Sequence, residues 1–192
     1  MVRPMLLLAL AAGFLGGCSH VPVMSVIRLA RADLTNADPA LLRAAVKLPR
    51  SLRLRRVVLR MGVAVGGGPE EAQEFTLREA SDPSDVLALA NELEGGTYIL
   101  AYRLDPVEAA RLAAFRDALK QKQQAGGTRG GRLTVAIRPD ACRTAELPDR
   151  PVTFTAYLQT EKTGGYVPLA RDVDLRTMSP GRDLAAEIPP CG

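Results

Sequence analysis

The sequence predicts an α+β fold: a mainly antiparallel β-sheet or partial sandwich with two to three packed helices and one disulfide. Three observations lead to this prediction. Charged residues make up 24% and hydrophobic residues 47% of the 192-residue chain, which is typical of a globular protein. Alternating apolar and polar residues, typical of half-buried strands, dominate its final third, and two middle segments have helical caps and spacing. Residues 23–192 suffice for one domain with a single core.

The beginning of the chain has the pattern of an export signal. Arg3 precedes an apolar run from Met5 to Leu15, which is far shorter than the roughly 20 residues that a membrane-spanning helix needs. The run ends in Leu15-Gly16-Gly17-Cys18, which resembles the lipobox of bacterial lipoproteins.

This resemblance implies that residues 1–17 are a signal peptide and that Cys18 becomes an acylated N-terminus carrying lipid such as palmitate. Residues 18–22 would form the tether, and the covalent lipid would be the only attached group, with no other cofactor. Ser19 follows the cysteine, where enterobacterial lipoproteins retained in the inner membrane have Asp. The resemblance therefore implies a cell-envelope protein, on the periplasmic face of the outer membrane in a Gram-negative host.

The next part of the chain predicts a strand, a short helix and a hairpin. The strand lies within residues 23–34. Asp38-Pro39 is typical of a helix start, and a helix ending at Pro49 follows from the spacing of Leu41, Leu42, Ala45 and Val46. Residues 57–65 and 74–78 alternate on either side of a glycine-rich turn, which predicts two paired strands.

Seven basic residues and no acidic one lie between Arg43 and Pro69; they are Arg43, Lys47, Arg50, Arg53, Arg55, Arg56 and Arg60. One interpretation is a solvated strand face, on which Arg56 and Arg60 pair across the hairpin with Glu74 and Glu79. The alternative is a surface that binds an anionic partner, such as lipid headgroups or lipopolysaccharide.

Two capped helices are predicted in the middle of the chain. Ser81-Asp82-Pro83 begins the first and Gly95-Gly96 ends it, with an apolar stripe of Val86, Leu89, Ala90 and Leu93. A strand over 97–104 leads to the capping box Asp105–Glu108, which begins a helix to about Gln124 that buries Leu112, Phe115 and Leu119. The glycine-rich loop 126–131 follows a helix rather than a strand, so it lacks the arrangement of a phosphate-binding loop.

The final third predicts strands over 133–137, 152–159 and 166–175, with a turn at Thr163-Gly164-Gly165. With Cys18 assigned to lipid, Cys142 and Cys191 form an even pair. Such a pair predicts a disulfide in an oxidising compartment, which would join the C-terminus to the body of the domain.

A dense group of polar residues follows the turn, comprising Tyr166, Arg171, Asp172, Asp174 and Arg176. Asp172 and Asp174 would share one face of a strand. The favoured interpretation is structural ion pairing with Arg171 and Arg176. The alternative is a functional site, because paired carboxylates can perform acid–base chemistry or hold a hard cation.

No motif in the sequence indicates catalysis. The only histidine, His20, lies beside the lipid site, which excludes Ser-His-Asp, Cys-His and histidine-dependent zinc sites in the domain. We expect no enzymatic activity, no metal and no nucleic-acid partner. The preferred function is an interaction or accessory subunit that is held to the membrane by lipid and contacts other envelope proteins. A binding module for anionic envelope components is the alternative, and a carboxylate-based enzyme the weaker one.

Overall fold

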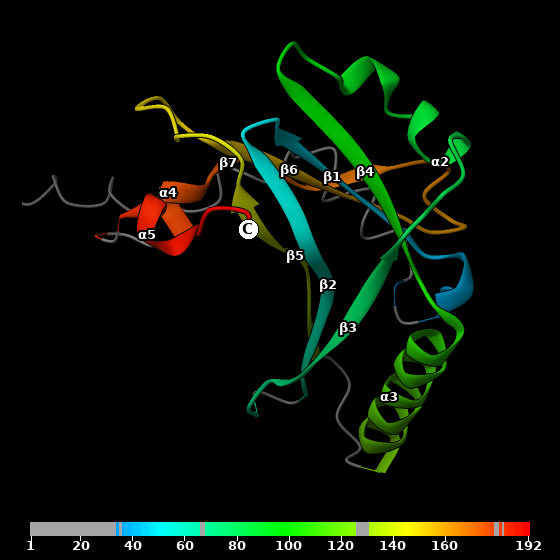
Figure 1. Ribbon diagram of the computed structural model, residues 1–192. Helices are drawn as coiled ribbons and strands as arrows, with labels where there is room; N and C mark the ends of the chain where they lie inside the picture. Colours follow the sequence, from blue (N-terminus) through cyan, green and yellow to red (C-terminus); the bar gives the residue numbers. More distant parts are fainter. Residues whose placement is uncertain (1–33, 35, 66–67, 126–130, 179–180, 182) are drawn as a thin grey trace, which may run out of the picture.

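Seven antiparallel strands form one strongly curved, nearly barrel-like sheet in the computed structural model (Figure 1). The structure describes residues 34, 36–65, 68–125, 131–178, 181 and 183–192. The strands lie in the order β5-β2-β3-β4-β1-β6-β7. Their bounds are β1 (Arg43–Pro49), β2 (Leu52–Val65), β3 (Glu71–Glu79), β4 (Thr97–Leu104), β5 (Gly131–Arg143), β6 (Thr153–Gln159) and β7 (Val167–Asp174).

One long helix and several short ones accompany the sheet in the described part of the chain. They are η1 (Pro39–Leu41), α2 (Ser84–Leu87), η2 (Ala90–Glu92), α3 (Pro106–Ala125), α4 (Leu175–Met178) and α5 (Leu184–Glu187). The prediction of an α+β protein with a mainly antiparallel sheet is therefore confirmed. No helix among these residues is both long enough and apolar enough to cross a membrane.

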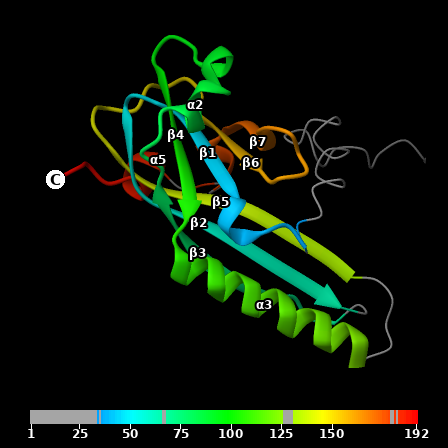
Figure 2. The same cartoon turned by 90° about the vertical axis from the view of Figure 1, so that its right-hand side faces the viewer.

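The hydrophobic core lies on the face of the sheet that α3 covers, which we term the inner face. Figure 2 shows α3 running along this face beside β2 and β3. Leu112, Phe115 and Leu119 are buried on α3, as predicted, and join a core that also contains the alternating apolar residues of β2. The rings of Phe75 and Phe115 are 6.1 Å apart, which joins helix to sheet.

Asp105 caps α3 as the sequence predicts, because its carboxylate accepts a hydrogen bond of 2.9 Å from the backbone N–H of Glu108. The carboxylate of Glu108, the other member of the predicted capping box, contacts β3. It accepts a hydrogen bond of 3.0 Å from the backbone N–H of Thr76 in β3. Because β3 pairs with β4 only over 77–79, this contact satisfies a backbone group just where the two strands separate.

The prediction of a helix that ends at Pro49 is wrong. Asp38 does cap a single turn, η1, by accepting a hydrogen bond of 2.8 Å from the Ala40 backbone N–H. Residues 43–49 instead form β1, in the middle of the sheet between β4 and β6. All five central residues of β1 are buried, on both faces of the sheet. This double burial removes the apolar–polar alternation that identifies a half-buried strand.

The helix predicted between Ser81 and Gly95 is reduced to the single turns α2 and η2. Of its predicted stripe, Leu89 is buried and Val86 half-buried, whereas Ala90 and Leu93 are exposed. The opposite, outer face of the sheet offers little apolar surface beneath this segment. That surface consists of Ala45, Ile99 and Tyr157.

The hairpin of β2 and β3 is confirmed, and Arg60 lies opposite Glu74 in the register. The ion pairs differ from those predicted. Arg60 pairs with Glu70 at 2.7 Å, and Glu74 pairs with Arg138 of β5 at 2.9 Å. Arg56 donates a hydrogen bond to the Thr76 hydroxyl, so its predicted pairing with Glu79 is wrong.

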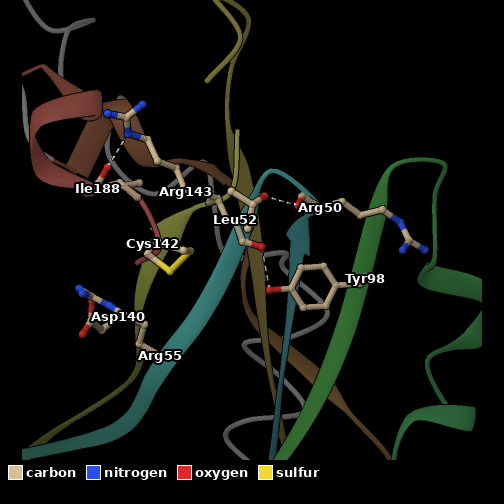
Figure 3. Close-up of a disulfide and its surroundings, with 10 residues drawn as sticks. Arg50, Leu52, Arg55, Tyr98, Asp140, Cys142, Arg143 and Ile188 are labelled. Carbon is tan, nitrogen blue, oxygen red and sulfur yellow. Dashed lines mark hydrogen bonds and ion pairs between the residues drawn. A yellow bond between two sulfur atoms is a disulfide. The ribbon is translucent and has the colours of Figure 1, made fainter. Parts of the chain in front are cut away.

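The predicted disulfide between Cys142 and Cys191 is confirmed (Figure 3). It joins the chain terminus to the end of β5, which is longer than predicted and continues through Pro139. Proline is tolerated there because β5 is an edge strand. The Cys191 backbone N–H donates to the Arg143 carbonyl, and the Arg143 N–H donates to Pro189, each at 2.9 Å.

Three predictions fall outside the described residues, apart from Leu34 and Gly131. They are the lipobox, the strand within 23–34 and the loop 126–131.

Candidate functional site

The two groups of polar residues that the sequence singled out meet, in part, on the outer face of the sheet. The segment 84–94, which contains α2 and η2, packs on Ala45, Ile99 and Tyr157 and forms ion pairs with β1 and β7. We term the charged and tyrosine side chains gathered there, with Thr155, the outer cluster. It comprises Arg43, Lys47, Asp85, Glu92, Glu94, Thr155, Tyr157, Tyr166, Arg171 and Asp172.

Lys47 of β1 is the buried cation of the outer cluster, with a side chain only 6% exposed. Its Nζ lies 3.1 Å from Glu94 Oε1 and 3.8 Å from Asp172 Oδ1. These two carboxylates are 74% and 57% exposed. The aliphatic stem of Lys47 is therefore buried in the sheet while its charge is balanced by acids that remain hydrated.

Arg171 of β7 forms a two-pronged ion pair with Glu92, at 2.9 and 3.1 Å. Tyr157 donates a further hydrogen bond of 2.9 Å to the same carboxylate. The Arg171 contact holds the pKa of Glu92 below its ordinary 4.5. Burial, with the bond to Glu92, raises the pKa of Tyr157. At neutral pH Glu92 is therefore a fixed acceptor and Tyr157 a fixed donor.

A third ion pair joins Arg43 of β1 to Asp85 of α2 at 3.6 Å. Tyr166 lies nearby, and its ring meets that of Tyr157 edge-on with centroids 6.5 Å apart. Burial raises the pKa of Tyr166 to about 12. Its hydroxyl is buried without a hydrogen-bond partner among the described residues.

Asp172 reaches Lys47 through an irregular part of β7. Its φ of 50° lies in the left-handed region, which Asp tolerates better than most residues. The Asp172 backbone N–H donates to the Thr155 hydroxyl, which donates to the Asp172 carboxylate, each at 3.1 Å. The β6–β7 register shifts twice between Phe154 and Tyr157. Such irregularities change the direction in which a side chain points.

Three acids of the segment over the sheet, Asp85, Glu92 and Glu94, each pair with a strand cation. Neither Glu92 nor Tyr157 changes protonation near neutrality, where a general acid or base is most efficient. The arrangement is suited to fastening this segment to the sheet rather than to moving protons.

Asp174 and Arg176 lie apart from these contacts. Asp174 accepts hydrogen bonds from the backbone N–H groups of Val152 (3.2 Å) and Arg176 (3.1 Å). Arg176 lies 4.0 Å from Asp174 and donates to two carbonyls of the 148–150 loop. The predicted pairing of Arg176 with Asp174 is confirmed, whereas Arg171 pairs with Glu92 instead of with an aspartate of β7.

The seven basic residues of the Arg43–Arg60 stretch are divided among several places. Two belong to the outer cluster, Arg60 pairs with Glu70, and Arg55 pairs with Asp140 at 2.7 Å. Arg50 and Arg53 flank the start of β2, close to two arginines from other parts of the chain. We term these four the basic end; they are Arg50, Arg53, Arg143 and Arg150.

The basic end surrounds the β1–β2 turn and the disulfide, as Figure 3 shows for Arg50 and Arg143. Arg50 and Arg150 line a depression of about 450 Å³, and Arg53 and Arg143 line another of about 390 Å³. In the described part of the chain, no carboxylate lies within ion-pair distance of these four side chains. Glu94 and Glu146 do line the same depressions.

The sequence-based reasoning missed the three acids over the sheet. The signal available was their proximity in sequence, at 85, 92 and 94, but their partners lie far away along the chain. No group of three or more potential metal ligands of the His, Cys, Asp or Glu type occurs among the described residues. No protein-family model, curated protein or solved structure matches the chain.

Proposed function

We propose that the protein is a lipid-anchored protein of the cell envelope that acts without catalysis, as an interaction or accessory subunit. The anchor is Cys18, which in a Gram-negative host holds the domain at the periplasmic face of the outer membrane. The observation that carries this proposal is the bond between Cys142 and Cys191. Structural disulfides are typical of exported proteins, and export is also what the lipobox implies.

Two further observations support this proposal, the first for a role without catalysis and the second for protein interaction. The best-defined polar group in the molecule, the outer cluster, consists of paired charges that fasten one segment to the sheet. In the described sheet, β5 is an edge strand of 13 residues. The backbone of an edge strand can pair with a strand from another protein, which gives a partner a physical route to bind.

The anchor is tested by Cys18→Ala. We expect this substitution to abolish labelling with radioactive palmitate, because it removes the residue that would carry the acyl chains. We also expect the protein to move from the membrane fraction to the soluble fraction, because stable anchoring needs two or more acyl chains. Cys191→Ser is the matched control, since it also removes a cysteine but should leave the protein in the membrane. A Cys18→Ala protein that still fractionated with membranes would contradict the proposal.

A second candidate function is the binding of anionic envelope components at the basic end. It is favoured by the four arginines of the basic end, which line neighbouring depressions and have no ion-paired carboxylate in the described part of the chain. An exposed cationic surface of this kind attracts phosphorylated headgroups, with an affinity that salt reduces.

Cosedimentation of non-lipidated protein (Cys18→Ala) with vesicles tests this candidate. We expect binding to anionic vesicles at low salt, little binding to neutral ones, and a loss of binding in the double variant Arg50→Glu, Arg53→Glu. The matched control is Arg55→Glu with Arg60→Glu, which reverses two cations that already have acidic partners. Equal binding to neutral and anionic vesicles would exclude this function.

A further inference from the structure

A cavity of about 310 Å³ lies between α3 and the sheet, where β2 ends and β5 begins. β2 and β5 are antiparallel, so the start of β2 lies beside the end of β5. The basic end surrounds that opposite end of the same pair of strands. The volume is at the lower limit of typical small-molecule sites, which begin at roughly 300 Å³. Neither the outer cluster nor the basic end contributes a residue to it. Its lining residues are Asn36, Met61, Val63, Arg116, Leu119, Lys120, Gln123, Arg132 and Leu133.

The sheet and the helix give this cavity apolar walls. Met61, Val63 and Leu119 are buried members of the core, and Leu133 is the exposed apolar side chain beside them, at 37% exposure. Burying methylene groups against such walls is favourable. If each methylene occupies about the 30 Å³ of a water molecule, the cavity has room for roughly ten.

Among the described residues, the charged side chains that line the cavity are all cations. Arg116 is 5% exposed and donates a hydrogen bond to the Ala37 carbonyl. Lys120 and Arg132 are more exposed, on the helix and strand sides. In the part of the chain that the structure describes, Asp117 lies 4.0 Å from Lys120 and Glu70 is ion-paired with Arg60; neither acid lines the cavity.

Apolar walls combined with cationic side chains complement a molecule that has one acyl chain and one anionic head. We propose that this cavity binds a fatty acid, with the chain against Met61, Val63 and Leu119 and the carboxylate toward Lys120 and Arg132. The inference goes beyond the anchor at Cys18 and does not depend on it, because it rests on the lining residues alone.

The absence of tryptophan from the sequence allows a direct test. Leu133→Trp places a single tryptophan at the cavity, and ω-bromoundecanoate is titrated into the full-length protein while fluorescence is recorded. Bromine quenches tryptophan on contact, so we expect saturable quenching that unbrominated undecanoate reverses. Gln123→Trp is the second reporter, from the helix side, should Leu133→Trp not fold.

Charge reversal then tests the role of the cations. In the reporter background, Lys120→Glu with Arg132→Glu should weaken binding by about tenfold, as expected for replacing two favourable exposed charge interactions with repulsive ones. The matched control is Lys122→Glu with Arg138→Glu. These residues lie on the same helix and strand but pair with Glu71 and Glu74, outside the cavity, so binding should change less than twofold.

Four results would overturn the proposal. The first is quenching that does not saturate, and the second is equal quenching by a brominated alkyltrimethylammonium of the same length. The third is that the Lys120 and Arg132 reversals have no effect on binding. The fourth is that binding is seen only in a Cys18→Ala background. The last result would mean that an acyl chain of the anchor, rather than a fatty acid, occupies the cavity.

Discussion

Asp172 combines a charge partner with a backbone that disfavours most side chains. Among the non-glycine residues that the structure describes, Asp172 is the only one with a positive φ, at 50°. Asp172→Asn keeps both the tolerance for this conformation and an acceptor for Thr155, whereas Asp172→Ala loses them. We expect Asp172→Ala to be less stable than Asp172→Asn by about 1–2 kcal/mol, measured by urea unfolding. Equal stabilities would show that the backbone conformation carries no cost.

The ion pair of Glu92 makes stability depend on pH. Because Arg171 lowers the pKa of Glu92 in the folded state, its stabilising contribution is fully present above the ordinary value of 4.5 and is lost as pH falls through the folded value. Glu92→Gln should therefore be less stable than the natural protein at pH values above 4.5, and the difference should shrink as the pH falls below 4.5.

Urea unfolding at a series of pH values measures this effect. Glu146→Gln, at an exposed residue outside the outer cluster, is the control and should follow the natural protein throughout. A difference between Glu92→Gln and the natural protein that stayed constant with pH would argue against the ion pair as its source.

At the same scale, residue chemistry predicted some members of the site but not their partners. Arg171 and Asp172 stand out as polar residues near a turn, and Lys47 as part of a basic stretch. Their pairing with Glu92 and Glu94 depends on how a distant segment folds over the sheet. Sequence spacing contains no information about such contacts, whereas the capping of α3 by Asp105 is local and could be predicted.

At the scale of elements, β4 and β6 were predicted best, although the five central residues of β6 are all buried. Residues 97–104 match β4 in both bounds, and β6 differs from its prediction by one residue. β1 was predicted as a helix because Leu41, Leu42, Ala45 and Val46 fit helical spacing, and both of its faces are buried. Its identity as a strand is determined by pairing with β4 and β6, which tertiary structure alone supplies.

The disulfide is expected to stabilise the fold substantially. Cys142 and Cys191 are 49 positions apart, and closing a loop of that length stabilises a fold by about 4 kcal/mol in the chain-entropy treatment. The double variant Cys142→Ser, Cys191→Ser should lose up to that amount, measured by urea unfolding. The natural protein under reducing conditions should behave alike, and a loss below about 1 kcal/mol in both would contradict this expectation.

At the scale of the whole molecule, the cavity and the basic end lie at opposite ends of the β2–β5 pair. Arg53 lies opposite Cys142 at one end, and Val63 lies opposite Leu133 at the other. Arg53 and Val63 are ten positions apart, which corresponds to about 33 Å along a strand. Substitutions at one end are therefore expected to leave binding at the other unchanged, and the two binding proposals can be tested separately.

The central position of β1 has a consequence for how the chain reaches this fold. β1 is the first strand of the described sheet in chain order, yet Arg43 lies opposite Gln159, more than a hundred positions later. Contacts between such distant positions form slowly, because a long loop must close before they can be made. A chain that emerges N-terminus first would hold β1 unpaired on one side until β6 follows. The first strand of the described sheet to emerge is therefore among the last to be secured.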